Sequence, residues 1–174
     1  MFTSDDIVLT SDLSEYNIIT GKHLPEQVIV AIVDEDAHRG VIGKNPFHFK
    51  NYNLSEASLV VNGVHEPQEL YKLNAIAGDK VDMYANFLEN TGISTDDREF
   101  GITMEDYYGG SFMLVWDRTQ DKCNRFHRRI TDSGSISINL KSRAALTQTV
   151  TVIIYATYSK DLIIDGDKVL TDAF

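Results

Sequence analysis

The order of apolar and polar positions predicts a chain built mostly of strands. Residues 28–33 are six consecutive apolar positions, a run typical of a strand that is covered on both faces. Residues 148–158 instead alternate, with Val150, Val152 and Ile154 on one predicted face. We expect further strands at residues 7–9, 16–19, 54–61, 64–65, 112–116 and 136–140, and a terminal hairpin at residues 162–164 and 169–170.

Turn signals separate these strands. Asn62-Gly63 favours a tight type I′ turn that leads into Val64 and His65, and we expect Pro67 to break the pairing after them. Turns at this spacing are typical of sandwiches and barrels. The sequence therefore predicts an all-β fold, a jelly-roll sandwich of about eight antiparallel strands, in a single domain over residues 1–174.

One segment has a helical period instead. Apolar residues within residues 79–90 recur at helical spacing, with Asp79 as the predicted N-cap and Gly92 just past the end. This predicts one short helical insertion of three turns, which residues 70–77 extend or precede. The remainder up to residue 110 is polar and contains glycine, so we expect a long loop there, and loops of that length are normally functional.

The densest local pattern lies in residues 44–63. Asn45-Pro46 predicts a chain reversal, because Pro46 fixes its own φ angle and favours an extended residue before it. Phe47, Phe49 and Tyr52 follow, three rings within a predicted loop. Since burying such a ring is worth roughly 2 kcal/mol, we expect the end of a sheet or a neighbouring subunit to cover them.

Composition and charge narrow the range of partners. The chain has 43% hydrophobic residues, a net charge of −10 and one cysteine, Cys123, so it forms no intrachain disulfide. The negative charge argues against surfaces for nucleic acid or anionic lipid. Neither a secretory signal nor an apolar stretch of roughly 18 residues is present in the sequence, so we expect an intracellular or virion location without a membrane partner.

Few residues suggest chemistry, and each has a plainer interpretation. Asp34, Glu35 and Asp36 with His38 offer oxygen ligands suited to Ca²⁺, but they are also typical of a solvated turn after a buried strand, which we prefer. Residues 165–167, Asp-Gly-Asp, invite the same comparison and favour a hairpin turn. We expect no metal, no cofactor and no enzymatic activity.

Three further alternatives stay open. Glu105 and Asp106 beside two tyrosines are candidate paired carboxylates of a hydrolase. Cys123 with His127 is a candidate nucleophile and base. The basic run at residues 125–129 is a candidate nucleic-acid contact, although five residues on an acidic chain would bind weakly, and we prefer pairing with acidic neighbours.

Several segments resemble a known protein family. They are residues 24–34, residues 45–54 (Asn-Pro-Phe-His-Phe-Lys-Asn-Tyr-Asn-Leu), residues 60–63 (Val-Val-Asn-Gly), and residues 90–92, 102–107, 112–119, 134–138 and 152–158. Together they resemble an uncharacterised invertebrate family similar to gene products of virus-like mobile elements, adomaviruses and adintoviruses. That family is related to major capsid proteins of the double jelly-roll type.

The resemblance implies a structural role. It implies a capsid-like jelly roll, the second roll of a double jelly-roll protein or a host-retained relative, which self-associates as a homo-oligomer, a trimer in this class. The natural subunit contacts are then Asn45, Pro46, Phe47, Phe49, Tyr52, Tyr107 and Tyr108, together with the region of residues 92–110. The alternative from another class is a lectin-like ligand-binding module that uses Tyr107, Tyr108 and Trp116.

Overall fold

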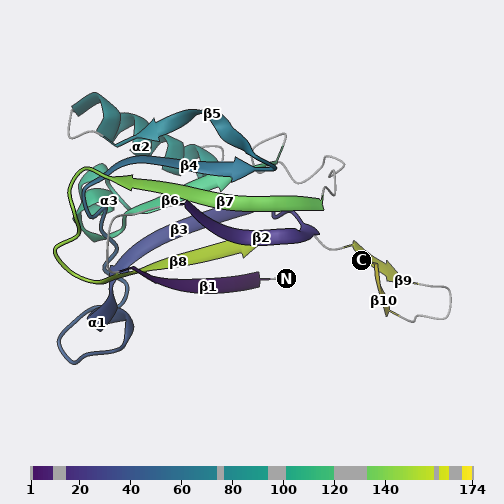
Figure 1. The fold of residues 1–174 in the computed structure, drawn as a ribbon, viewed down its shortest axis with the longest axis horizontal. Coiled ribbons are helices and arrows are strands. Elements are labelled where there is room, and N and C mark those ends of the chain that lie inside the picture. Colours follow the sequence, from purple (N-terminus) through teal and green to yellow (C-terminus); the bar gives the residue numbers. More distant parts are fainter. Residues whose placement is uncertain are drawn as a thin grey trace.

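The computed structural model describes residues 2–9, 15–73, 77–93, 101–119, 133–158, 161–164 and 170–173. Their strands form two four-stranded antiparallel sheets, drawn in Figure 1. In order across the first sheet the strands are β1 (Phe2–Leu9), β8 (Val150–Thr157), β3 (Gln27–Asp34) and β6 (Met113–Asp117). Across the second sheet they are β2 (Glu15–His23), β7 (Ser133–Ser142), β4 (Leu54–Val61) and β5 (Val64–Lys72).

The strand order confirms the predicted jelly roll. The chain crosses from one sheet to the other between β1 and β2, β2 and β3, β3 and β4, β5 and β6, β6 and β7, and β7 and β8. Sequence neighbours are therefore mostly separated in space, as in the two Greek keys of a jelly roll. The predicted terminal hairpin is also present, as β9 (Asp161–Ile164) paired with β10 (Leu170–Ala173).

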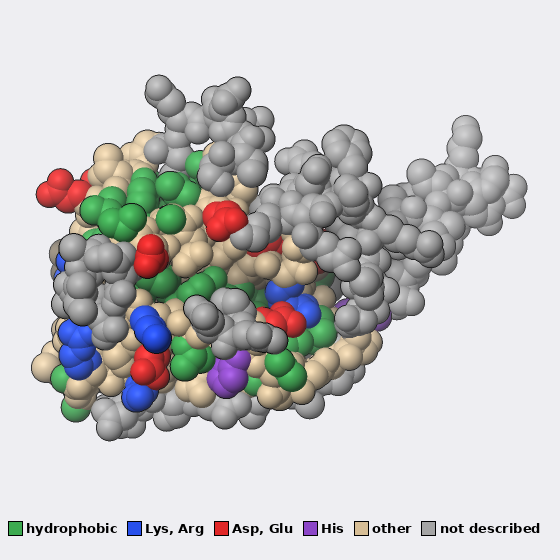
Figure 2. Space-filling view, turned by 90° about the horizontal axis from the view of Figure 1, so that it is seen from above, with side chains coloured by type: hydrophobic (Ala, Val, Ile, Leu, Met, Phe, Trp, Pro, Cys, Tyr) green, Lys and Arg blue, Asp and Glu red, His purple; other side chains and the backbone are tan. Residues whose placement is uncertain are grey.

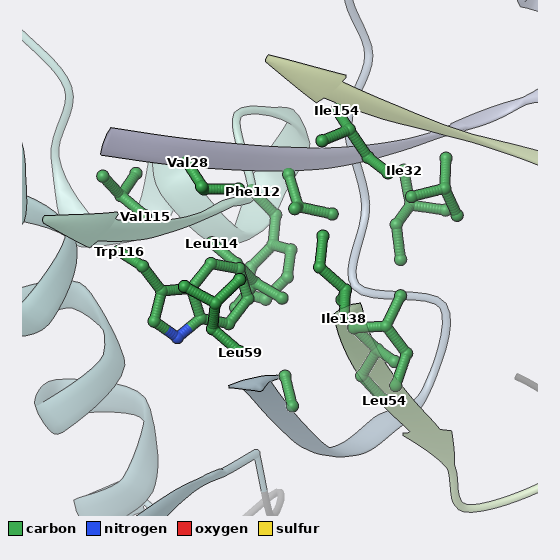
Figure 3. Packing of buried hydrophobic residues seen from close by; sticks show 14 of the residues in the cluster. Val28, Ile32, Leu54, Leu59, Phe112, Leu114, Val115, Trp116, Ile138 and Ile154 are labelled. Carbon is green, nitrogen blue, oxygen red and sulfur yellow. The ribbon is translucent and has the colours of Figure 1, made fainter. Parts of the chain in front are cut away.

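The core lies between the two sheets. Figure 3 shows Val28 and Leu114 of the first sheet facing Leu59 and Ile138 of the second. All four are buried almost completely. The alternation along β8 is confirmed as well, since Val150, Val152, Ile154 and Ala156 are all buried on this side.

The predicted hairpin turn and the predicted break in pairing at Pro67 are both confirmed, but the second strand continues beyond the break. Asn62 and Gly63 have φ angles of 51° and 81°, the two positive values of a type I′ turn. Beyond Pro67, however, β5 pairs again with β4 through Tyr71 and Lys72 after a shift in register. A proline is tolerated there because β5 is an edge strand, so one of its sides needs no hydrogen bonds from a neighbouring strand.

The helices exceed the single short insertion that was predicted. The helix at residues 79–90 exists as α2 (Ala77–Asn90), and Gly92 follows it with a φ angle of 73°. Asp79 lies inside its first turn rather than at the predicted N-cap. Leu70 belongs to β5 instead of preceding the helix. A one-turn helix, α1 (Glu35–His38), follows β3.

A third helix, α3 (Met104–Gly110), replaces part of the predicted loop. It begins with a capping box, because the Thr103 hydroxyl accepts from the Asp106 backbone N–H while the Asp106 carboxylate accepts from the Thr103 backbone N–H. A threonine followed three residues later by an acidic residue is the sequence signal that could have predicted it. Residues 94–100 of the predicted loop lie outside the described residues.

Helices α2 and α3 close the free edge of β6. The Tyr107 hydroxyl donates to the Met113 carbonyl at 2.7 Å, and the Asn90 side-chain amide donates to the Val115 carbonyl at 2.8 Å. Met113 and Val115 lie two positions apart along β6, so their carbonyls point to the same side of the strand. Side chains therefore satisfy acceptors that an edge strand would otherwise expose.

Candidate interaction site at the α1–β4 loop

The segment between α1 and β4, residues 39–53, projects from one end of the sandwich together with α1. In Figure 1 both lie at the lower left, away from the two sheets. We call this segment the α1–β4 loop. It contains five of the seven residues that the sequence predicted as subunit contacts, namely Asn45, Pro46, Phe47, Phe49 and Tyr52.

The loop starts from a defined helix end. The Gly40 N–H donates to the Ala37 carbonyl, and the Val41 N–H donates to the Asp36 carbonyl. With Gly40 at a φ angle of 80°, these bonds form a Schellman motif, the usual way for a helix to stop at a glycine. The direction in which the loop leaves α1 is therefore set by backbone hydrogen bonds.

Two consecutive turns then present the apolar residues. The Lys44 N–H donates to the Val41 carbonyl, and Gly43, at a φ angle of 90°, fits the third position of a type II turn with Ile42 before it. The His48 N–H donates to the Asn45 carbonyl, which confirms the predicted reversal at Asn45-Pro46. Ile42 and Phe47 thus occupy central positions of turns and point outward, with 100% and 75% of their surface exposed.

The base of the loop is tied to the sandwich. Phe49 forms an isolated parallel bridge with Ser111, in which its N–H donates to the Gly110 carbonyl and its carbonyl accepts from the Phe112 N–H. The Lys50 N–H donates to the Ile32 carbonyl of β3. Phe49 and Tyr52 are half-buried as a result, and burial raises the pKa of the Tyr52 hydroxyl.

Ion pairs hold the tip of the loop against α1. The Lys44 ammonium donates to Asp34 Oδ2 at 3.0 Å and to Asp36 Oδ2 at 2.8 Å, and Arg39 pairs with Glu35 at 2.7 Å. The hydrogen bond from Lys44 lowers the pKa of Asp34, which also caps α1 by accepting from the Asp36 N–H. Residues 34–50 carry three carboxylates and three Lys or Arg residues, so this projection is neutral on a chain of net charge −10.

These pairs also bear on the calcium hypothesis. All three carboxylates of residues 34–36 are engaged by the basic side chains Lys44 and Arg39. Within the described part of the chain, no group of three or more His, Cys, Asp and Glu side chains is arranged to hold a metal ion. The solvated charged turn is the interpretation that this geometry favours.

The two remaining predicted contact residues lie on α3. Tyr108 is half-buried, and its hydroxyl donates to the Lys80 carbonyl at 2.9 Å. Tyr107 is fully buried among the rings of Tyr84, Phe87 and Phe112. Its side chain is therefore part of the core of this chain, contrary to the expectation of an exposed contact residue.

The structure places Trp116 and Asp106, which two other hypotheses invoked, in roles that serve the fold. Trp116 is buried and stacks on Tyr71 at a centroid distance of 5.6 Å, so the lectin-like alternative lacks both the Tyr107 and the Trp116 ring face. Asp106 serves the capping box of α3, and its hydrogen bonds with Thr103 lower its pKa. Cys123, His127 and the rest of residues 120–132 lie outside the described residues, as do residues 165–167.

The sequence analysis missed Val41 and Ile42. Both side chains are exposed, Val41 to 47% and Ile42 completely. A signal was present, since two β-branched residues between Gly40 and Gly43 fall in a turn and have no strand or helix to bury them. The exposed apolar part of the loop is therefore larger than the aromatic residues indicated.

Figure 2 views the side of α2 and β5 and shows hydrophobic side chains interspersed with acidic and basic ones. Scattered apolar side chains of this kind are normal on protein surfaces. No helix in the described residues is long and apolar enough to cross a membrane.

Comparison with known proteins shows the fold alone. No protein-family model and no curated protein sequence matches the chain. A chain in the cryo-EM structure of the Sputnik virophage is similar in fold, with a TM-score of 0.58 and 10% sequence identity. The similarity covers 99% of this chain and 37% of the virophage chain, so this chain spans well under half of the length of that neighbour.

Proposed function

We propose that this chain is a structural, non-catalytic jelly roll of a virus-like particle, and that it assembles with other jelly-roll subunits. The strand order and the similarity to a virophage chain support a capsid-like role. The observation that carries the proposal is the α1–β4 loop, which exposes Ile42 and Phe47 on a backbone fixed at both ends. A rigid loop loses little conformational entropy when it binds.

Ile42 and Phe47 are large enough for their burial to contribute substantially to binding another chain. Burying an isoleucine or phenylalanine side chain fully is worth about 1.5–3 kcal/mol. Ile42 and Phe47 together thus supply a substantial part of the roughly 8 kcal/mol of a micromolar complex. Because the projection is neutral, two chains of net charge −10 meet there with less repulsion than elsewhere.

The family resemblance adds finer proposals. The subunit is a major capsid protein or a host-retained relative from the adomavirus- and adintovirus-like family, and it assembles as a homotrimer. Within that proposal Asn45, Pro46, Phe47, Phe49, Tyr52 and Tyr108 contribute to the contact, joined by Val41 and Ile42.

Light scattering across a concentration range tests the assembly. We expect the wild-type chain to form trimers or larger closed particles, visible by negative-stain imaging, and the double variant Ile42→Ser with Phe47→Ser to lose most of this association. Both side chains are exposed, so the variant keeps its unfolding midpoint. Val64→Ser is the matched control, because Val64 is 59% exposed on the β4–β5 hairpin.

Two outcomes would contradict the proposal. A wild-type chain that stays monomeric at high concentration would leave the loop without the proposed partner. Equal loss of association in the double variant and in Val64→Ser would show that apolar surface in general, rather than the α1–β4 loop, drives the association.

A further inference from the structure

The Asn62-Gly63 turn is a sequence motif whose chemistry the proposed assembly does not use. It is the only Asn-Gly pair in the chain. In such a pair the backbone nitrogen of the glycine can attack the side-chain carbonyl carbon of the asparagine, because glycine has no Cβ to crowd its nitrogen. Both residues are exposed, so water reaches them. The turn therefore contains the groups needed for spontaneous deamidation.

This reaction needs only the chain and water. A bond forms between the Gly63 nitrogen and Asn62 Cγ, the bond from Cγ to Nδ2 breaks, and ammonia leaves with the proton of the Gly63 amide. The product is a five-membered succinimide ring. Water then adds to one of the two ring carbonyls and opens the ring to aspartate or isoaspartate, so no oxidant or reductant takes part.

The folded turn keeps the two reacting atoms apart. Asn62 is the first central residue of the type I′ turn, with a φ angle of 51°. Because a type I′ turn is the mirror image of type I, the ψ angle at this residue is roughly 30°. At that angle the following nitrogen lies on the opposite side of the Cα–C bond from Cβ and the side-chain amide. Attack on Cγ therefore requires the backbone to rotate out of the turn.

The Asn62 side chain is also tied to β7. Asn62 Oδ1 accepts from the Ser135 N–H at 2.9 Å, and the Asn62 N–H donates to the Ser135 carbonyl at 3.0 Å. The amide lies against Gly134, where a Cβ atom would overlap Oδ1 and lie 2.7 Å from Nδ2. A donor on Oδ1 favours attack on a carbonyl carbon, but the Ser135 N–H acts only in the closed turn, where the Gly63 nitrogen does not reach Cγ.

We propose that Asn62 is a latent deamidation site, which the closed turn and its tie to β7 keep unreactive until the β4–β5 hairpin opens. Because hydrolysis does not reverse, converted chains accumulate as the hairpin opens repeatedly. Isoaspartate lengthens the backbone of a turn whose length fixes the pairing of Val61 with Val64, so a chain converted in this way does not regain the same hairpin. The inference concerns the hairpin alone and stands whether or not the α1–β4 loop is a contact.

Mass spectrometry of the peptide that contains Asn62 measures conversion during incubation in warm, mildly alkaline buffer. We expect the folded chain to convert roughly tenfold or more slowly than the chain unfolded in guanidinium chloride, because reaction in the fold requires local opening. In the unfolded chain Gly63→Ala slows conversion several-fold, since the added Cβ crowds the attacking nitrogen. Equal rates in the folded and unfolded chains overturn the proposal, and so does an unfolded chain that does not convert.

Gly134→Ala tests the tie to β7. Its Cβ displaces the Asn62 amide, so we expect conversion of the folded chain to rise several-fold, whereas the rate in guanidinium chloride stays that of the wild type. Gly101→Ala is the matched control, because nothing lies within 4 Å of its Cβ, and it keeps the wild-type rate in both conditions. Circular dichroism establishes that each variant is folded at the incubation temperature. An unchanged rate in folded Gly134→Ala contradicts the role of the tie.

Discussion

The hydroxyl of Tyr107 provides the sharpest test of how α3 is attached to the sandwich. Tyr107→Phe removes one oxygen and keeps the ring contacts with Tyr84, Phe87 and Phe112, at centroid distances of 4.9–5.7 Å. The lost bond to the Met113 carbonyl is 2.7 Å long and lies at a side chain with 0% exposure. A buried polar group left unpaired costs about 1–3 kcal/mol, and this bond is part-buried, so we expect the free energy of unfolding to fall by about 1 kcal/mol, the lower end of that range.

Urea unfolding followed by circular dichroism measures this change, with an unchanged m value as the sign that only stability has altered. Tyr108→Phe is the matched control, since its hydroxyl donates to the Lys80 carbonyl at an exposed site where water replaces the bond. We expect a loss below about 0.5 kcal/mol there. Equal falls in the free energy of unfolding for the two substitutions would refute this prediction, because the burial of a hydroxyl would then not determine how much stability its loss removes.

Three further predictions follow from the same geometry. Lys44→Met removes the hydrogen bond that lowers the pKa of Asp34, so we expect NMR titration to place that pKa closer to 3.8; an unchanged pKa would show that Lys44 does not hold Asp34 in solution. The methyl group of Gly63→Ala meets open space, but the φ angle of 81° is unfavourable for alanine. We therefore expect backbone strain to lower the free energy of unfolding in urea by about 1–2 kcal/mol. Gly101→Ala, which also meets open space, should leave it unchanged. Burial raises the pKa of the Tyr107 hydroxyl above its ordinary value of 10.0, so in alkaline solution the unfolded chain loses this proton before the folded chain does. The stability that the neutral hydroxyl contributes is therefore complete below pH 10.0 and declines above it. We expect Tyr107→Phe to make the fall in urea midpoint between pH 8 and pH 11 less steep.

The fold was predictable because its strands are marked locally and its core follows a period of two. The β4 bounds, the Asn62-Gly63 turn and the inner face of β8 followed from residues that sit next to one another in the sequence. The course of β5 past Pro67 could not be predicted in this way, because a strand accommodates a proline only when it lies at the edge of its sheet. Only the sheet order shows that β5 is an edge strand.

The candidate site was predictable only in part. Phe47 was found because aromatic residues in a loop are conspicuous. Ile42 was missed because the two glycines beside Val41 and Ile42, which mark a turn, were not used as a signal. Tyr107 was misplaced for another reason. Its neighbour Phe87 belongs to another helix and reaches Tyr107 only after α2 and α3 pack together.

The two side-chain hydrogen bonds at β6 affect whether a further strand can pair with this edge of the first sheet. An incoming strand, whether from a swapped segment or an aggregating chain, needs free carbonyls along an edge to template its own hydrogen bonds. At β6 two of these positions are already taken by Asn90 and Tyr107, so an invading strand would first have to detach both helices. Extension of that sheet by another strand therefore requires both helices to move first, and a chain that packs against this flank of the intact sandwich meets side chains rather than free backbone groups.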